Sequence, residues 1–195
     1  GKLLSVDYDA FHLRIVSSIM GYDAPEGSFH EHLAKLYFGE DIDEEDYKEA
    51  KKFTFQFIYN PRGIPDELLQ LEFFQGVKDL TEKIWEVYKE HGIIQTGKYH
   101  RQISGSKIDN FNPAKALSYS LQSTGTEIVM KKAKKCMDYI NENEYKTKVV
   151  LYLYDSLLFD LHPDDPDSLV EEIEEIMEDG KLTVNSKIGK TFADV

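Results

Sequence analysis

The hydrophobic positions of this 195-residue chain follow two different periods, and the change from one to the other predicts the order of its elements. Short apolar runs, typical of strands, occur at 3–7 (LLSVD), 149–161 (VVLYLYDSLLFDL) and 181–189 (KLTVNSKIG). Apolar residues three or four apart predict helices over about 9–20, 28–38, 43–59, 65–91, 113–141 and 164–180, with a hairpin at 92–104. This order predicts an α+β fold in which helices cover one face of a mostly antiparallel sheet.

Turn and capping residues set the expected ends of the helices. Ser28 followed by Glu31 has the pattern of a capping box at the start of the second helix. Asn112 before Pro113 is expected to begin the long helix that follows the hairpin. The sequence NPRG at 60–63 is expected to end the helix over 43–59, and Gly76 is a candidate break that would divide 65–91 into a helix pair.

Two aspartates directly follow apolar strand residues: Asp7 comes after LLSV, and Asp155 comes after LYLY. Moving a lone ionised carboxylate out of water costs several kcal/mol of free energy unless a positively charged or hydrogen-bonding group contacts it. Each acid can simply mark a strand end or turn, where aspartate is common. If the two strands lie side by side, both carboxylates share one edge and can bind Mg²⁺ together with substrate phosphates. The residues alone leave both interpretations open.

The helix expected over 43–59 presents a lysine and two aromatic rings on one face. Lys51, Phe55 and Tyr59 are four residues apart, so their side chains share that face. In this order they would meet a triphosphate, a sugar or base, and a base pair. The alternative is an ordinary core helix, because its phenylalanines can pack inward and lysine stems can lie along apolar surface.

The net charge of −13 argues at first against nucleic acid, since DNA-binding proteins usually carry a basic surface. The acids are concentrated, however: residues 164–180 contain nine acidic and no basic residues and are expected to form a solvated helix. Basic residues cluster elsewhere, at 48–52, 98–107 and 131–135. The net charge therefore does not exclude a protein that binds nucleic acid.

The single cysteine, Cys136, excludes an internal disulfide and suits a reducing compartment. The apolar runs are far shorter than the roughly 20 residues that cross a bilayer, and the start of the chain has no secretory pattern. We therefore expect a cytoplasmic protein that does not enter a membrane.

Seven stretches that cover nearly the whole chain resemble, in the same order, the polymerase core of family A DNA polymerases, the DNA polymerase I type. DYDAFHLRI (7–15) resembles that family's motif A, KKFTFQFIYN (51–60) its motif B, and LYDSLLFD (153–160) its motif C. The others are FHEHLAKLYFG (29–39), GIIQTGKYHRQIS (92–104), LSYSLQSTGTEIVM (117–130) and SKIGKTFADV (186–195). The resemblance implies an antiparallel palm sheet (1–22 and 93–195) with an all-helical fingers subdomain (23–92) inserted between its strands.

The resemblance also implies a template-directed DNA polymerase and a role for individual residues. Asp7 and Asp155, with the backbone carbonyl of Tyr8, would hold two Mg²⁺ ions while the primer 3′-hydroxyl attacks the α-phosphate of a dNTP and pyrophosphate leaves. The residues at the nucleotide would be Lys51 and His30 at the triphosphate, Phe55 at the base or sugar, and Tyr59 at the templating base. Arg14, Arg101 and Gln122 would contact the backbone or minor groove of primer–template DNA.

Departures from the family's motifs leave alternatives open. His12 stands where the family has a glutamate that rejects ribose, and Lys48 only partly replaces an arginine that normally grips the triphosphate. These differences suggest a divergent, phage-encoded member, and they keep a sugar-tolerant or single-subunit RNA polymerase-like enzyme as an alternative. Because a core strand begins at the start of the chain, we expect thumb and N-terminal palm segments of the same polymerase upstream. An inactive fragment that lacks them is the third interpretation.

Overall fold

The computed structural model describes residues 1–60, 65–97 and 100–195. The chain divides into two compact units, each considered by itself. The first unit consists of residues 1–11 and 125–195, and the second of residues 12–124. The second unit is thus an insertion between the first strand of the first unit and the rest of it. The hairpin at 92–104 and the first part of the long helix cluster with the inserted helices. The palm and fingers boundaries expected at 22 and 92 stay a prediction.

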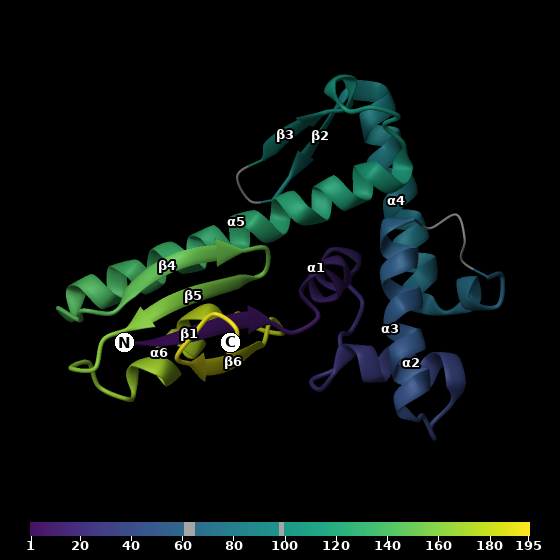
Figure 1. Ribbon diagram of the computed structural model, residues 1–195. Coiled ribbons are helices and arrows are strands. Elements are labelled where there is room, and N and C mark those ends of the chain that lie inside the picture. Colours follow the sequence, from purple (N-terminus) through teal and green to yellow (C-terminus); the bar gives the residue numbers. More distant parts are fainter. Residues whose placement is uncertain (61–64, 98–99) are drawn as a thin grey trace. The chain divides into compact units, whose positions relative to one another are not determined.

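The first unit is built on a four-stranded sheet with the strand order β4-β5-β1-β6, which Figure 1 shows in its lower part. Its strands are β1 (Lys2–Tyr8), β4 (Lys148–Leu153), β5 (Ser156–Leu161) and β6 (Val184–Gly189). All three pairings are antiparallel, and β4 and β5 form a hairpin. The antiparallel sheet expected from the apolar runs is confirmed.

The two faces of this sheet differ in burial, as the alternation of side chains along a strand requires. In β1, Leu4, Val6 and Tyr8 are buried, whereas Leu3, Ser5 and Asp7 are partly exposed. Leu157 and Phe159 of β5 stand opposite Val6 and Leu4 and are fully buried. Helix α6 (Leu169–Met177) and the last part of α5 (Pro113–Glu142) lie on this buried side, since the Tyr8 hydroxyl reaches Met177 and the Cys136 thiol lies near Tyr8.

The acidic segment 164–180 differs from the single solvated helix that its charge predicted. Only Leu169–Met177 is helical, and Leu169, Ile173 and Met177, four residues apart, are buried on one face. Asp165 lies before the helix and accepts hydrogen bonds from the backbone N–H groups of Lys146 and Thr147. Four of the nine acids lie on this amphipathic helix, away from the face that belongs to the core, and the other five flank it.

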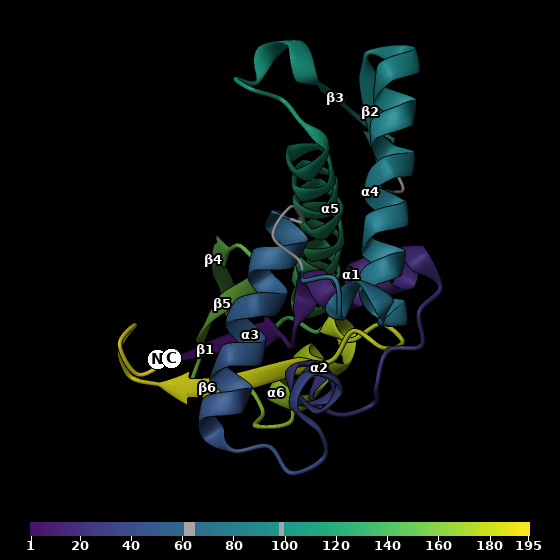
Figure 2. The same cartoon turned by 90° about the vertical axis from the view of Figure 1, so that its right-hand side faces the viewer.

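The second unit is mainly helical and also contains a two-stranded hairpin (Figure 2). Its elements are α1 (Phe11–Met20), α2 (Phe29–Phe38), α3 (Glu44–Tyr59), η2 (Leu68–Gln70), α4 (Glu72–His91), β2 (Ile93–Thr96), β3 (Arg101–Ser104), η3 (Gly105–Lys107) and the first part of α5. Strand β2 follows α4 directly and packs beside it, and α2 packs against α3. The hairpin begins at Ile93, after the expected fingers segment (23–92), whose described elements are all helical.

The core of the second unit is aromatic. Phe29, Phe57, Phe73 and Phe74 are all at most 2% exposed. Neighbouring rings in this group lie with centroids 5.2–5.6 Å apart at steep angles, the edge-to-face arrangement that aromatic rings favour. This cluster joins α2, α3 and α4, and so fixes the orientation of α3 within the unit.

Most of the expected helix ends are observed. Ser28 accepts a hydrogen bond from the Glu31 N–H, although the Glu31 carboxylate pairs with Lys35 at 2.9 Å instead of completing the capping box. Helix α3 ends at Tyr59 as predicted, and residues 61–63 of the expected NPRG breaker lie outside the described residues, as do 98–99 of the hairpin.

The break predicted at Gly76 is wrong, because α4 continues through this residue. A Cβ atom at this position would lie 3.0 Å from Sδ of Met20, so the glycine serves close packing against α1. Among the described residues, no helix is long and apolar enough to span a membrane.

Candidate active site

The pairing of β1 with β5 brings the two aspartates together. Asp7 stands opposite Ser156 in the register, so Asp155, in the turn that precedes Ser156, lies beside the end of β1. The N–H of Tyr8 donates a hydrogen bond to the backbone carbonyl of Asp155 at 3.2 Å. In the same turn Tyr154 has a positive φ of 54° and an 88% exposed side chain. The turn thus directs Tyr154 into solvent and holds the backbone of Asp155 against β1.

The charge of Asp155 acts on the Asp7 carboxyl, as expected from the register of β1 and β5. Burial raises the pKa of Asp7, and the negative charge of Asp155 raises it further. Lys187 of β6 acts in the opposite direction, and Asp9 adds a smaller upward effect. Two acids held this close repel each other when both are ionised, which a bound cation would relieve.

Two residues of β6 belong to the same part of the sheet and were missed in the sequence. Asn185 stands directly opposite Asp7, and Lys187 stands opposite Ser5. Since alternate residues of a strand share a face, Ser5, Asp7, Asn185 and Lys187 lie on the face away from α6. Asn185 and Lys187 could be identified only from the register between β1 and β6, which the sequence does not reveal.

The acid pair suits a cation that takes only part of its coordination from protein. Among the described residues, no three His, Cys, Asp or Glu side chains group closely enough to hold a metal ion. Two carboxylates are oxygen donors, which Mg²⁺ prefers, and Mg²⁺ commonly completes its shell with water and substrate phosphates. The donor set therefore fits Mg²⁺ better than a metal that requires a full protein cage.

In the second unit, α3 divides its aromatic residues between the core and the surface. Phe57 and Ile58 are buried, whereas Phe55 is 36% exposed. The rings of Phe55 and Tyr59 lie parallel, with centroids 6.4 Å apart and planes at 1°, and Lys51, one turn before Phe55, is exposed. The face defined by Lys51, Phe55 and Tyr59 is therefore not the core face of this helix.

Two histidines adjoin the aromatic residues of α3. The Tyr59 hydroxyl lies 2.5 Å from Nδ1 of His12 on α1. The His30 ring is 5.5 Å from that of Phe55 and is itself buried at 5% exposure. The structure thus groups His12, His30, Phe55 and Tyr59 within one unit, although they come from three helices.

The other predicted nucleotide- and DNA-binding residues have different environments. Lys48 is exposed and pairs with Glu44 at 2.6 Å. Arg101, on β3, is exposed, and Gln122, on α5, is exposed with its amide nitrogen 3.2 Å from the Ser118 hydroxyl. These three side chains are accessible to a ligand.

Arg14 is a correction to the predicted set of DNA contacts. Its side chain is 3% exposed and donates hydrogen bonds to the carbonyls of Pro25, at 3.1 Å, and Gly27, at 2.9 Å. Its guanidinium carbon also lies 5.9 Å from the centre of the Phe29 ring. Arg14 therefore braces the segment between α1 and α2, and its buried guanidinium is not presented to DNA.

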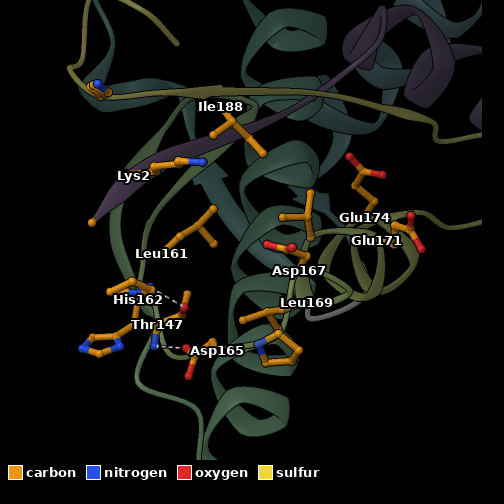
Figure 3. Close-up of a pocket in the computed structure, with 15 residues that line it drawn as sticks. Lys2, Thr147, Leu161, His162, Asp165, Asp167, Leu169, Glu171, Glu174 and Ile188 are labelled. Atoms are coloured by element: carbon orange, nitrogen blue, oxygen red, sulfur yellow. Dashed lines mark hydrogen bonds between the residues drawn. The ribbon is translucent and has the colours of Figure 1, made fainter.

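A cavity of about 950 Å³ lies elsewhere in the first unit, near the beginning of β1. Figure 3 shows Lys2, Leu161 and Ile188 on one side of it, with Glu171 and Glu174 on the other. Asp7 lies toward the opposite end of the same strand, so the cavity does not include the acid pair. Polar residues of this cavity are hydrogen-bonded to one another. The Thr147 hydroxyl accepts a hydrogen bond from the His162 N–H, and the Thr147 N–H donates to the Asp165 carboxylate. We place no part of the active site there.

No family model matches the chain. Its fold is similar to a solved structure, the POL domain of Pol1 from M. smegmatis in complex with DNA primer-template and dNTP, with a TM-score of 0.82. The likeness covers 98% of this chain at 16% sequence identity. The combination of antiparallel sheet and helices is therefore that of a polymerase palm and fingers. This chain spans 40% of the length of the chain it matches.

Proposed function

We propose that this chain is the palm and fingers core of a template-directed DNA polymerase of the family A type. It would add dNTPs to a primer 3′ end and release pyrophosphate. The observation that carries the proposal is the pairing of Asp7 with Asp155 at the end of β1, in a fold that resembles a polymerase POL domain. That solved structure contains DNA primer-template and dNTP, which are the partners we propose here.

In the first unit, Asp7 and Asp155 would hold two Mg²⁺ ions, with the carbonyl of Tyr8 as a further oxygen donor. When bound, such ions lower the barrier to phosphoryl transfer by stabilising the charge on the attacking and leaving oxygens. The protein's contribution is geometric: β1 and β5 are hydrogen-bonded along their length, so the two carboxylates keep their spacing. Catalysis of this kind depends on positioning and charge stabilisation more than on proton transfer by side chains.

In the second unit, the exposed face of α3 would bind the incoming nucleotide. The Lys51 ammonium group would meet the triphosphate as a point charge. The Phe55 ring, already exposed and parallel to Tyr59, would stack on the base or sugar, and Tyr59 would lie at the templating base. His30 would act from behind Phe55, since its ring contacts that residue and is itself buried.

Primer–template DNA would be bound by exposed polar groups of the second unit. Arg101 of β3 can contact phosphates or the minor groove, and the Gln122 amide can donate to groove acceptors. Arg14 is left out of this set because its hydrogen bonds are made to Pro25 and Gly27. The strongly negative net charge does not oppose the proposal, since nine acidic residues are concentrated in the segment 164–180.

A sugar-tolerant polymerase is a second candidate, favoured by the contact between His12 and Tyr59. A neutral imidazole that accepts the Tyr59 hydrogen bond at Nδ1 carries its proton on Nε2 and can donate, which a carboxylate at this position cannot do. Such a donor can tolerate the 2′-hydroxyl of a ribonucleotide. Primer extension with dNTPs and with rNTPs decides between the two, and strong rejection of rNTPs would exclude the tolerant enzyme.

The principal test is primer extension by the full-length protein that contains this chain, because the chain spans only 40% of the polymerase chain it resembles. Asp7→Asn or Asp155→Asn should lower the rate by orders of magnitude with the dNTP affinity little changed. Asp160→Asn, an exposed acid on the same hairpin, is the matched control. Undiminished extension by either active-site variant would refute the metal assignment. If the intact protein fails to extend a primer at all, the proposed polymerase function is wrong.

A further inference from the structure

The end of helix α6 is tied to β1 and α5 by buried side chains. The last carbonyl groups of an α-helix have no partner within the helix and need donors from elsewhere. Here three successive carbonyls receive such donors. Lys132 Nζ donates to Ile176 O at 2.9 Å and to Glu178 O at 2.6 Å, and the Tyr8 hydroxyl donates to Met177 O at 2.6 Å.

Both donors are almost completely withdrawn from solvent. Tyr8 is 2% exposed, and Lys132 is 5% exposed although it carries a charge. A cation is favourable at a helix C-terminus because it meets the negative end of the helix dipole. Asp179 lies 3.7 Å from the Lys132 ammonium group, while burial raises the pKa of the adjacent Cys136 thiol to about 12 and keeps it neutral. The carbonyls and Asp179 are therefore the groups that meet the Lys132 charge here.

Tyr8 also connects this buried junction to the acid pair. It directly follows Asp7, and its own N–H donates to the carbonyl of Asp155 at 3.2 Å. Its ring is stacked on Phe11, with centroids 4.5 Å apart, so the side chain has little freedom to move. One residue thus holds the Asp155 turn with its backbone and the end of α6 with its hydroxyl group.

We propose that Tyr8 and Lys132 are positioning residues that act through the end of α6 to hold Asp7 and Asp155 at the spacing a divalent cation requires. This inference rests on the proposed function. Lys132 fixes the carbonyls on either side of Met177, Met177 fixes the Tyr8 hydroxyl, and Tyr8 fixes the backbone that joins the two acids. Groups that orient metal ligands without touching the metal commonly change metal affinity by about 10-fold or more when they are removed.

The test measures Mn²⁺ binding to the 195-residue chain by electron paramagnetic resonance of the free ion, which needs no catalytic activity. The acid-pair component is the part of the binding that Asp7→Asn removes. Tyr8→Phe and Lys132→Met should each weaken that component by about 10-fold. Tyr8→Phe keeps the ring on Phe11 and loses only the hydroxyl group. Circular dichroism and urea unfolding establish that each variant is folded at the temperature used.

Two matched controls distinguish positioning from a general loss of packing. Lys131→Met removes an exposed lysine next to Lys132 on α5, and Tyr152→Phe removes a hydroxyl group of the same sheet that lies 3.4 Å from Thr126 of α5. Neither should change the Mn²⁺ affinity. Rescue of the Lys132→Met defect by Lys132→Arg would further support a role for the positive charge.

The outcomes separate the inference from the proposed function. If Asp7→Asn removes binding while Tyr8→Phe and Lys132→Met bind as the wild type does, the positioning role is wrong and the metal site stands. If all lysine and tyrosine variants weaken binding equally, including the controls, the effect is not specific to the α6 junction and the inference fails. If Asp7→Asn binds as the wild type does, the proposed metal site itself is wrong, and the inference fails with it.

Discussion

The hydroxyl group of Tyr59 lies 2.5 Å from Nδ1 of His12, and the two rings meet edge to face with centroids 6.0 Å apart. This contact joins the end of α3 to the start of α1. It also holds the Tyr59 ring parallel to Phe55, because the hydroxyl group is anchored at the far end of the ring. The position of Tyr59 is therefore set by a residue far from it in the sequence.

The first prediction concerns the strength of this contact. Tyr59→Phe and His12→Ala should each lower the free energy of unfolding by about 0.5–1.5 kcal/mol, the usual net value of one hydrogen bond. The double variant should lose no more than the larger single loss plus a small packing term, since both changes remove the same bond. Urea unfolding of the four proteins in a double-mutant cycle measures this coupling. Fully additive losses would show that the bond contributes nothing.

The second prediction uses the division of aromatic residues on α3. Phe57→Ala should destabilise the protein by about 3–5 kcal/mol, because it removes a ring that is 2% exposed from the aromatic core. Phe55→Ala should cost far less stability, because that ring is 36% exposed, but it should weaken dNTP binding by removing a stacking surface. Thermal unfolding and nucleotide titration measure the two effects. An unchanged dNTP affinity in Phe55→Ala would contradict the nucleotide-binding role.

The third prediction follows from the raised pKa of Asp7. The folded protein binds a proton at Asp7 more tightly than the unfolded chain does, so stability falls as pH rises through the window between the unfolded pKa and the higher folded pKa. At neutral pH without divalent cations, Asp7→Asn should therefore be more stable than the wild type. The gain should vanish at about pH 3, where the carboxyl is protonated in both states.

The same experiment with Mg²⁺ supplies a second readout. A cation that binds only the folded protein raises its stability by mass action, and this gain should be smaller in Asp7→Asn. Urea unfolding at both pH values, with and without Mg²⁺, measures the two effects. Glu82→Gln, which changes an exposed acid on α4, is the control. It should show neither the gain in stability at neutral pH nor the smaller stabilisation by Mg²⁺. A variant that is destabilised at neutral pH would contradict the assigned electrostatics.

The fourth prediction distinguishes the two arginines first assigned to DNA. Arg101→Ala should weaken primer–template binding and reduce the dependence of affinity on salt by about one unit of slope, as loss of one phosphate contact does. Arg14→Ala should lower the thermal stability, because it leaves the carbonyls of Pro25 and Gly27 without their donor. It should leave the salt slope unchanged. Fluorescence anisotropy at several salt concentrations measures both slopes.

Much of the local structure could be read from the sequence. The strands, the hairpin and the ends of α3 and α5 agree with the apolar periods and with the expected cap at Asn112. The errors had physical causes. Gly76 does not interrupt α4 because the glycine makes room for Met20, and the acidic segment is helical only where Leu169, Ile173 and Met177 can be buried.

The sequence by itself determined the strand-forming runs, the two acids at strand ends and the face that Lys51, Phe55 and Tyr59 share, because these depend on neighbours a few residues away. Only the tertiary structure decided the register that sets Asp7 beside Asp155, the placement of Asn185 and Lys187, the burial of Arg14 and the bond from Tyr59 to His12. These depend on pairing between distant segments. A shift of one residue in such a pairing would turn every side chain of a strand to the opposite face, and that choice is made by packing of the whole core.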